Sequence, residues 1–184
     1  VDEMMIGFDE RIRRYRHPVA RGARLERLAF VHPTVNRWGQ HVIGTRMVSL
    51  GEIDAETAER FAAVSEIEAL SVQSTRPGTA HRDVLASQQE AYRRLGYEDA
   101  WRDHWQGGQT GFALCEIAHV DRPAESIPER GLYNWFISLP GAKKEETTLA
   151  TAEGGRILTL TGAWPTRTVV TELGPLEVAD LLVR

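Results

Sequence analysis

The chain has 184 residues, of which 42% are hydrophobic and 26% are charged, with a formal net charge of −4 and one cysteine. A chain of this length buries about 70% of its unfolded surface in one core, so we expect a single domain over residues 1–184. The acidic balance argues against a nucleic-acid partner, whose phosphates require an excess of Lys and Arg.

The single cysteine excludes an intramolecular disulfide framework and a cysteine-rich zinc site, which favours a cytoplasmic protein. No apolar run approaches the roughly 18 residues of a membrane span, so we expect no membrane partner. Arginines nonetheless crowd the first thirty residues, where they either meet an anionic substrate or form a solvated face balanced by acidic neighbours: Arg11, Arg13, Arg14, Arg16, Arg21, Arg24 and Arg27.

The N-terminal segment predicts a short strand at Met5–Phe8, followed by a polar turn or single helical turn over residues 9–16. That turn ends at His17, which precedes Pro18. Because the proline ring disfavours the helical region for the residue before it, His17 is biased towards an extended backbone, and this fixes the direction of its imidazole. A lone histidine before a proline is usually structural.

Two β-rich runs follow, at residues 25–32 and 40–50, and they predict a pair of antiparallel strands. Residues 33–39 lie between the two runs and have the Pro, Asn and Gly content of a hairpin loop. We therefore expect the chain to reverse direction within that loop.

Two amphipathic helices are predicted next, at residues 54–75 and 79–95. Asp54 and Thr79 are suitable N-caps, and Gly96 is a typical residue just beyond a helix C-terminus. The first helix is indicated by apolar residues at helical spacing, namely Phe61, Val64, Ile67 and Leu70. These residues are expected to form core rather than a site.

The segment from His104 to Glu116 carries three glycines in an aromatic-rich run. Glycine lacks a Cβ, so Gly107, Gly108 and Gly111 permit a positive φ or a close approach by a ligand or a neighbouring strand. Taken alone, the segment is also compatible with a tight turn that feeds a strand.

The last third of the chain has the pattern of a β-meander. Residues 131–138 predict a strand, residues 140–143 predict a turn, and residues 145–151 and 156–160 predict a hairpin that turns at 152–155. Together with the helix pair, these hairpins indicate an α+β fold with an antiparallel sheet.

The glycine segment resembles the active-site strand of the creatinase, prolidase and methionine-aminopeptidase superfamily, whose pattern is Gly-His-Gly-x-Gly-x-x-x-His-Glu. Gly111 and Glu116 match this pattern. The metal-binding histidine of the pattern falls on Gly108, and the histidine of its His-Glu pair falls on Cys115. The resemblance implies the pita-bread fold, a strongly curved antiparallel sheet whose convex face is covered by helices, in its Xaa-Pro peptidase-like branch.

Other segments extend the resemblance over nearly the whole chain. Thr45-Arg46 resembles the Asp-x-Thr-Arg strand, and counting back places its two metal aspartates on Ile43 and His32. Glu145 matches the metal-bridging glutamate, whereas the other metal glutamate falls on Phe136. The N-terminal domain, first helix and first strand of the family have no counterpart, so the resemblance implies the larger part of a catalytic domain.

The resemblance implies a metal site that has lost its ligands. A dinuclear centre of this type uses two aspartates, one histidine and two glutamates, because clustered carboxylates must neutralise two divalent cations. Glu145 is the single member of that set, so we expect no metal and no other cofactor. A rebuilt site from His17, His32, His41 and Glu145 is conceivable, but no spacing favours it.

The favoured function is therefore metal-independent hydrolysis of a C–N bond in a small amide, amidine or dipeptide-like substrate, as in the metal-free creatinases. His17 would carry the proton, and Glu145 or Glu116 would orient a water or a cationic group. A solvent-excluding wall would comprise Trp105, Phe112 and Trp135, and the substrate would also meet His104, Gly108 and Cys115. Nucleophilic catalysis by Cys115 is a weaker hypothesis, since a lone cysteine on an apolar strand usually packs.

Two alternatives remain open from the sequence. One is a catalytically silent module for ligand binding or dimerisation, and the other is a metallo-aminopeptidase or prolidase with a rebuilt metal site. We also expect self-association, or docking of the missing N-terminal segment, because the resemblance leaves sheet edge and apolar surface uncovered. Trp38, Trp101 and Trp164 would be suitable anchors if exposed.

Overall fold

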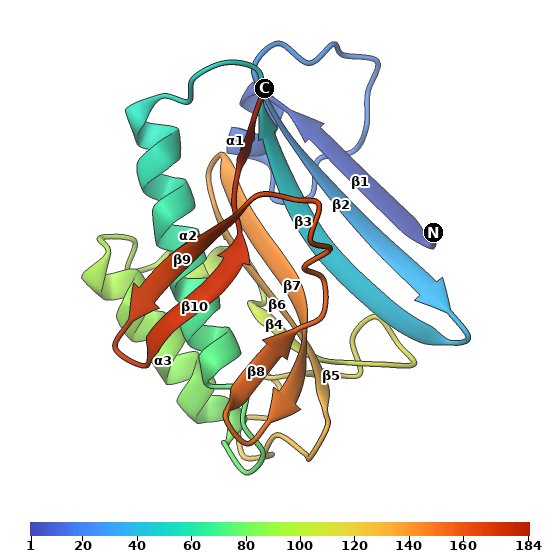
Figure 1. Cartoon of the computed structure of the whole chain (residues 1–184), viewed down its shortest axis with the longest axis vertical. Coiled ribbons are helices and arrows are strands. Elements are labelled where there is room, and N and C mark those ends of the chain that lie inside the picture. Colours follow the sequence, from blue (N-terminus) through green and yellow to red (C-terminus); the bar gives the residue numbers. More distant parts are fainter.

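The computed structural model describes all residues from 1 to 184 and has one large sheet with the strand order β1-β2-β3-β7-β6-β4-β5 (Figure 1). Strand β8 pairs with β7, β11 pairs with β3, and β9 and β10 form a separate hairpin. The strands are β1 (Glu3–Phe8), β2 (Leu28–Arg37), β3 (Gln40–Ser49), β4 (Gly107–Thr110), β5 (Ile117–Ala118), β6 (Leu132–Leu139), β7 (Ala142–Thr151), β8 (Gly154–Ile157), β9 (Thr166–Thr171), β10 (Gly174–Ala179) and β11 (Leu182–Val183).

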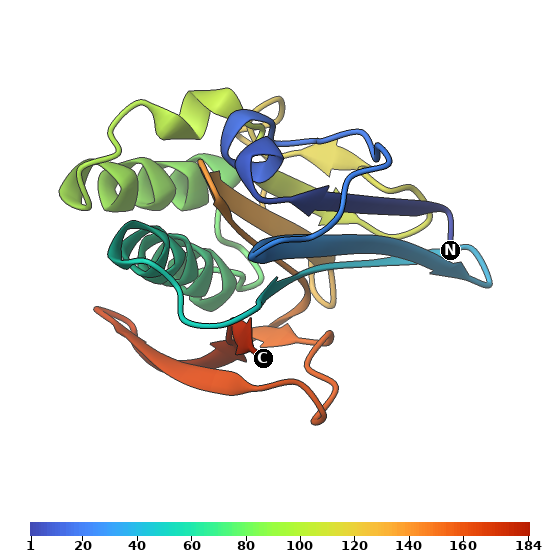
Figure 2. The ribbon, with the colours of Figure 1, turned by 90° about the horizontal axis from the view of Figure 1, so that it is seen from above.

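All strand pairs are antiparallel except β11 with β3. The helices are α1 (Glu10–Arg14), α2 (Ala55–Gln73), α3 (His81–Arg94) and the short 3-10 helix η1 (Ala100–Asp103). Helix α2 packs on the central strands β6 and β7, and it lies between α3 and the β9–β10 hairpin (Figure 2). The predicted α+β fold, a curved antiparallel sheet covered on one face by helices, is confirmed. No helix combines the length and the apolar character that a membrane span requires.

The start of α2 follows the prediction, whereas the start of α3 does not. The Asp54 carboxylate accepts a 2.7 Å hydrogen bond from the Thr57 backbone N–H and caps α2. Helix α3 has Ala80 rather than Thr79 at its N-cap, with no side-chain cap. The reason is tertiary: the backbone N–H of His81 donates to the Glu125 carbonyl, so the loop before β6 satisfies the helix end.

The loop expected at residues 33–39 is mostly strand, because the turn between β2 and β3 needs two residues only. Trp38 has φ of 56° and Gly39 has φ of 83°, the pair of positive values that a two-residue type I′ hairpin requires. The Asn36 side chain accepts a hydrogen bond from the Gly39 N–H and holds this turn. Trp38 is 85% exposed, whereas Trp101 and Trp164, also expected on the surface, are half-buried.

The main core lies between α2 and the sheet. Val64, Ile67 and Leu70 of α2 are almost fully buried there, as their helical spacing predicts. Strand β7 is buried on both faces, although it reads Lys143-Lys144-Glu145-Glu146. Because side chains alternate along a strand, Lys144 and Glu146 face α2, while Lys143 and Glu145 face the opposite side of the sheet.

Candidate functional site

A cleft of about 160 Å³ opens on the sheet face opposite α2. It lies where β1, β2, β6 and β7 present side chains to the loop before β4. The lining residues are Glu3, Met5, His17, His32, Trp105, Leu114, Asn134, Phe136, Lys143 and Glu145.

Glu145 is the buried carboxylate at the centre of the cleft, and its neighbours all supply positive charge or donors. Thr45 donates to Oε2 at 2.8 Å, the Asn134 amide donates to Oε1 at 2.9 Å, and the His32 imidazole contacts Oε2. Burial raises the pKa of Glu145, but the Lys143 ammonium and the hydrogen bonds outweigh it and hold that pKa at about 2. The carboxylate is therefore ionised across the neutral range.

Lys143 supplies the cation beside this carboxylate. Its Nζ lies 3.9 Å from Glu145 Oε2 and 5.6 Å from the ring centres of both Phe30 and Phe136. Burial lowers the pKa of Lys143, and the Glu145 charge opposes that effect. The two groups form an internal ion pair that neutralises the floor of the cleft.

His17 and His104 meet at the rim of the cleft. Their rings stack with centroids 4.8 Å apart, and the two Nε2 atoms are 3.2 Å apart, so one nitrogen donates to the other. The His104 and Phe136 rings pack edge-to-face, with centroids 4.1 Å apart. Desolvation lowers the pKa of His104 to about 2, and desolvation together with Lys143 lowers that of His17, so both rings are neutral at pH 7.

The structure brings several of the sequence-predicted site residues together. His17, Glu145 and Trp105 line the cleft, and beside it His104 stacks on His17 and packs edge-to-face with Phe136. Trp105 packs edge-on against Phe136, with ring centroids 4.7 Å apart.

Other predicted residues lie away from the cleft. Trp135 is fully buried on the helix side of β6, where its indole N–H donates to Thr75 at 2.8 Å. Phe112 is 74% exposed, and Glu116 accepts a 2.7 Å hydrogen bond from the Phe112 N–H, so this carboxylate closes the β4–β5 turn. Cys115 is half-buried in the same turn, and burial raises its pKa.

The glycines in β4 serve strand pairing. A Cβ on Gly108 would lie 2.1 Å from the Ile117 carbonyl oxygen, and one on Gly107 would lie 2.2 Å from the Asn134 carbonyl oxygen. Both contacts are shorter than any real Cβ contact, so the neighbouring strands β5 and β6 require glycine here. Close approach by a neighbouring strand therefore accounts for both glycines, and Gly107 also has a positive φ of 117°.

Sequence reasoning missed Asn134 and Lys143, and it considered His32 only in connection with a metal site, either lost or rebuilt. One signal could have found Lys143: in a strand, it must share the face of Glu145 two residues later. Asn134 carries no such signal, because its place depends on the pairing of β6 with β7.

A dinuclear metal centre, which the family resemblance implies, does not fit these residues. No group of three or more His, Cys, Asp or Glu side chains is arranged to hold a metal ion. Glu145 is already engaged by three donors, and the Lys143 ammonium would repel a divalent ion about 4 Å away by roughly 8 kcal/mol at an effective dielectric constant near 20. Ile43 and Phe136 offer no donor atoms where metal ligands were aligned.

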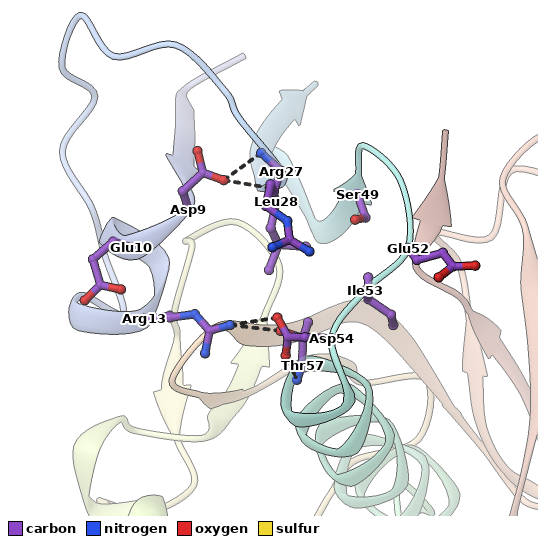
Figure 3. Close-up of a pocket in the computed structure, with 10 residues that line it drawn as sticks. All are labelled: Asp9, Glu10, Arg13, Arg27, Leu28, Ser49, Glu52, Ile53, Asp54 and Thr57. Carbon is purple, nitrogen blue, oxygen red and sulfur yellow. Dashed lines mark hydrogen bonds and ion pairs between the residues drawn. The ribbon is translucent and has the colours of Figure 1, made fainter.

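A second hollow, of about 200 Å³, lies between α1, the start of β2 and the N-terminus of α2 (Figure 3). Its charged groups are mostly paired with each other or with the backbone. Arg13 reaches the Asp54 carboxylate at 3.1 Å, and the Asp9 carboxylate accepts backbone N–H bonds from Arg27 and Leu28. These contacts join α1 to α2 across the hollow.

No protein-family model and no curated protein matches the sequence. Solved structures do match in fold. The X-Pro aminopeptidase from Thermotoga maritima has a TM-score of 0.79 at 20% identity, covering 98% of this chain and 49% of that chain. The prolidase from Pyrococcus furiosus has a TM-score of 0.77 at 22% identity, covering 86% of this chain and 49% of that chain.

A third match carries a different description. The N-terminal domain of the FACT complex subunit SPT16 from Cicer arietinum has a TM-score of 0.72 at 9% identity, covering 87% of this chain and 42% of that chain. The chain spans about half the length of the structures it matches. At these identities the likeness establishes the fold alone, and the chain has the pita-bread fold of the Xaa-Pro aminopeptidase and prolidase structures.

Proposed function

We propose that the chain is a metal-independent hydrolase of the C–N bond in a small amide, amidine or dipeptide-like molecule bound in the cleft. The observation that carries this proposal is the convergence of His17 and Glu145 on one cleft from distant parts of the chain. The fold that the chain shares with Xaa-Pro aminopeptidase and prolidase structures adds support.

His17 is suited to begin as a base. Hydrolysis of an amide joins the oxygen of water to the carbonyl carbon, breaks the C–N bond and transfers one proton of that water to the leaving nitrogen. Because its Nε2 faces His104, His17 has Nδ1 free to take the proton and return it. The lowered pKa of His17 leaves the ring neutral at pH 7, so it ends each turnover as it began.

Glu145 contributes through charge rather than as a second base. Its carboxylate raises the pKa of His17, but desolvation and the Lys143 ammonium lower that pKa more. The same carboxylate would stabilise the transient His17 imidazolium across the cleft.

A catalytically silent ligand-binding module is the second candidate, and one observation favours it. Three protein groups, His32, Thr45 and Asn134, already occupy most of the acceptor capacity of the Glu145 carboxylate, which leaves little of it to orient a water. The matching fold in a FACT complex subunit shows that structures of this shape are not all described as peptidases.

The experiment is a hydrolysis screen of small amides, amidines and dipeptides in the presence of a chelator. We expect the His17→Ala variant to lose a hundredfold or more in kcat while remaining folded, because His17 is exposed at the cleft rim. His41→Ala is the matched control, since His41 lies outside the cleft against the Gly111 carbonyl. Equal turnover by wild type and His17→Ala would refute the role of His17 as the proton carrier. If the wild type hydrolyses no substrate in the screen, the hydrolase proposal is refuted and the ligand-binding module is the remaining candidate.

The remaining expectations, a cytoplasmic location and self-association or docking of an N-terminal segment, stay proposals. The outer edge of β1 pairs with no other strand, which supports the second of them.

A further inference from the structure

Two buried polar side chains of the cleft leave hydrogen-bonding capacity unused. The Lys143 Nζ donates no hydrogen bond, although its side chain is only 4% exposed. The Asn134 Oδ1 accepts none, and Asn134 is 3% exposed. Buried polar groups are nearly always paired with protein atoms or ordered water, so an unpaired atom of a cleft-lining residue is a position that a ligand atom of the complementary type could fill.

The orientation of the Asn134 amide follows from its neighbour. Glu145 is ionised and can only accept hydrogen bonds, so the amide must present its NH2 group to the carboxylate, at 2.9 Å from Oε1. The Asn134 carbonyl oxygen is therefore the unpaired atom of this side chain, and it can accept a hydrogen bond from a ligand donor.

Lys143 and Asn134 stand on the two sides of one carboxylate. Asn134 contacts Glu145 Oε1, and Lys143 Nζ lies 3.9 Å from Oε2. Both residues line the same small cleft, so its wall includes one residue with an unused donor and one with an unused acceptor. A ligand group that complements both has an acceptor and a donor, as a secondary amide does.

Charge narrows the ligand class further. The Lys143 and Glu145 charges offset each other, His17 and His104 are neutral at pH 7, and Glu3 adds a further acidic side chain to the lining. A carboxylate ligand has no donor for Asn134 Oδ1, and a guanidinium ligand has no acceptor for Lys143 Nζ. The volume of about 160 Å³ resembles that of an engineered cavity of about 150 Å³ that holds benzene, so the bound fragment has about six non-hydrogen atoms.

We propose that the cleft binds an uncharged amide group whose carbonyl oxygen accepts a hydrogen bond from Lys143 Nζ and whose N–H donates to Asn134 Oδ1. The inference rests on the proposed function and deepens it, since it names the bound group and adds Lys143 to the residues that touch it. In a hydrolysis, the ammonium would stabilise the negative charge that develops on the carbonyl oxygen when water adds to the carbon.

The test uses binding, so that it is independent of turnover. The probes are N-methylacetamide, acetate and methylguanidinium, titrated to millimolar concentrations into the 15N-labelled protein and followed by NMR. We expect saturable shifts of the Lys143 Nζ and Asn134 Nδ2 signals with N-methylacetamide, and weaker effects with the two charged probes. No response of these signals to N-methylacetamide in the wild type would overturn the inference, as would tighter binding of acetate or methylguanidinium.

Two variants distinguish the contribution of Lys143 to binding from that of Lys144, its neighbour on the other face of β7. Lys143→Met is expected to weaken N-methylacetamide binding about tenfold or more, because a charge-assisted hydrogen bond is lost. Lys144→Met is the matched control and should bind as the wild type does, since Lys144 faces α2. Equal affinity in Lys143→Met would overturn the inference, and the wild-type signals decide the matter if that variant does not fold. Amide binding without hydrolysis of any substrate would support this inference and refute the hydrolase proposal.

Discussion

Glu145 makes the stability of the protein depend on pH in a predictable way. Its pKa is about 2 in the folded protein, compared with an ordinary value of 4.5. Each tenfold change in proton affinity is worth about 1.4 kcal/mol, so the lowering corresponds to roughly 3 kcal/mol of folding free energy. Because the folded-state pKa is depressed, this stability is present above pH 4.5 and is lost as the pH falls towards 2.

The perturbation is Glu145→Gln, which cannot titrate. The free energy of unfolding is measured by urea titration, followed by tryptophan fluorescence, at several pH values between 2 and 7. We expect the wild type to be more stable than the variant at pH 7, and the difference to shrink by roughly 3 kcal/mol on going to pH 2. The change at pH 7 should exceed the linkage value, because Lys143 becomes an unpaired buried cation.

A double variant removes that complication. Glu145→Gln combined with Lys143→Met deletes both charges of the pair, and we expect it to be more stable at pH 7 than Glu145→Gln alone. Stability curves of wild type and Glu145→Gln that run parallel from pH 2 to pH 7 would refute the reasoning, since they would mean that Glu145 binds its proton equally in the folded and unfolded chain.

Two further predictions concern stability. Gly107→Ala should lower the free energy of unfolding, measured in urea, by about 3 kcal/mol or more, because Gly107 has φ of 117° and the new Cβ would lie 2.2 Å from the Asn134 carbonyl oxygen. Gly22→Ala is the control and should be nearly neutral, since its new Cβ would meet nothing within 4 Å. Burial raises the pKa of Glu68 to about 8, so the folded protein holds this proton more tightly than the unfolded chain does, and the melting temperature should fall as the pH rises from 4.5 to 8. In Glu68→Gln, which cannot titrate, the melting temperature should depend less on pH over this range. An unchanged pH dependence in the variant would contradict the prediction.

Elements with local signals were predictable from the sequence, and those set by distant contacts were not. Helix α2 has its Asp54 cap and its apolar stripe within its own residues, and both predictions are confirmed. The chain reversal within residues 33–39 was predicted, but its two-residue length was not, because Trp38 adopts a positive φ that its residue type does not indicate. The hairpin of β9 and β10 was also not predicted, since its outward side chains are largely exposed and dilute the alternation.

The residues of the cleft also differ in how far the sequence alone could identify them. Glu145 and His17 were selected through a family resemblance, and they do line one cleft. Trp135 follows Asn134 and precedes Phe136, and those two neighbours face the cleft, so strand alternation directs the indole of Trp135 to the helix side. The ligand-facing pair of Lys143 and Asn134 depends on the register of β6 against β7, which is a tertiary feature.

Strand β7 offers an internal comparison between its two faces. Lys143 and Lys144 are adjacent, both are buried, and each lies near a carboxylate, yet their hydrogen bonding differs. Lys144 donates to the Ala179 carbonyl at 2.5 Å and lies 3.3 Å from Glu68, so the helix side satisfies its ammonium with protein atoms. Lys143 has a carboxylate at 3.9 Å and no acceptor in hydrogen-bond range. Unpaired buried atoms also occur on the helix side, at Glu68 and Thr148, but the unpaired ammonium of β7 belongs to a residue that lines the cleft, as a ligand-binding role for Lys143 requires.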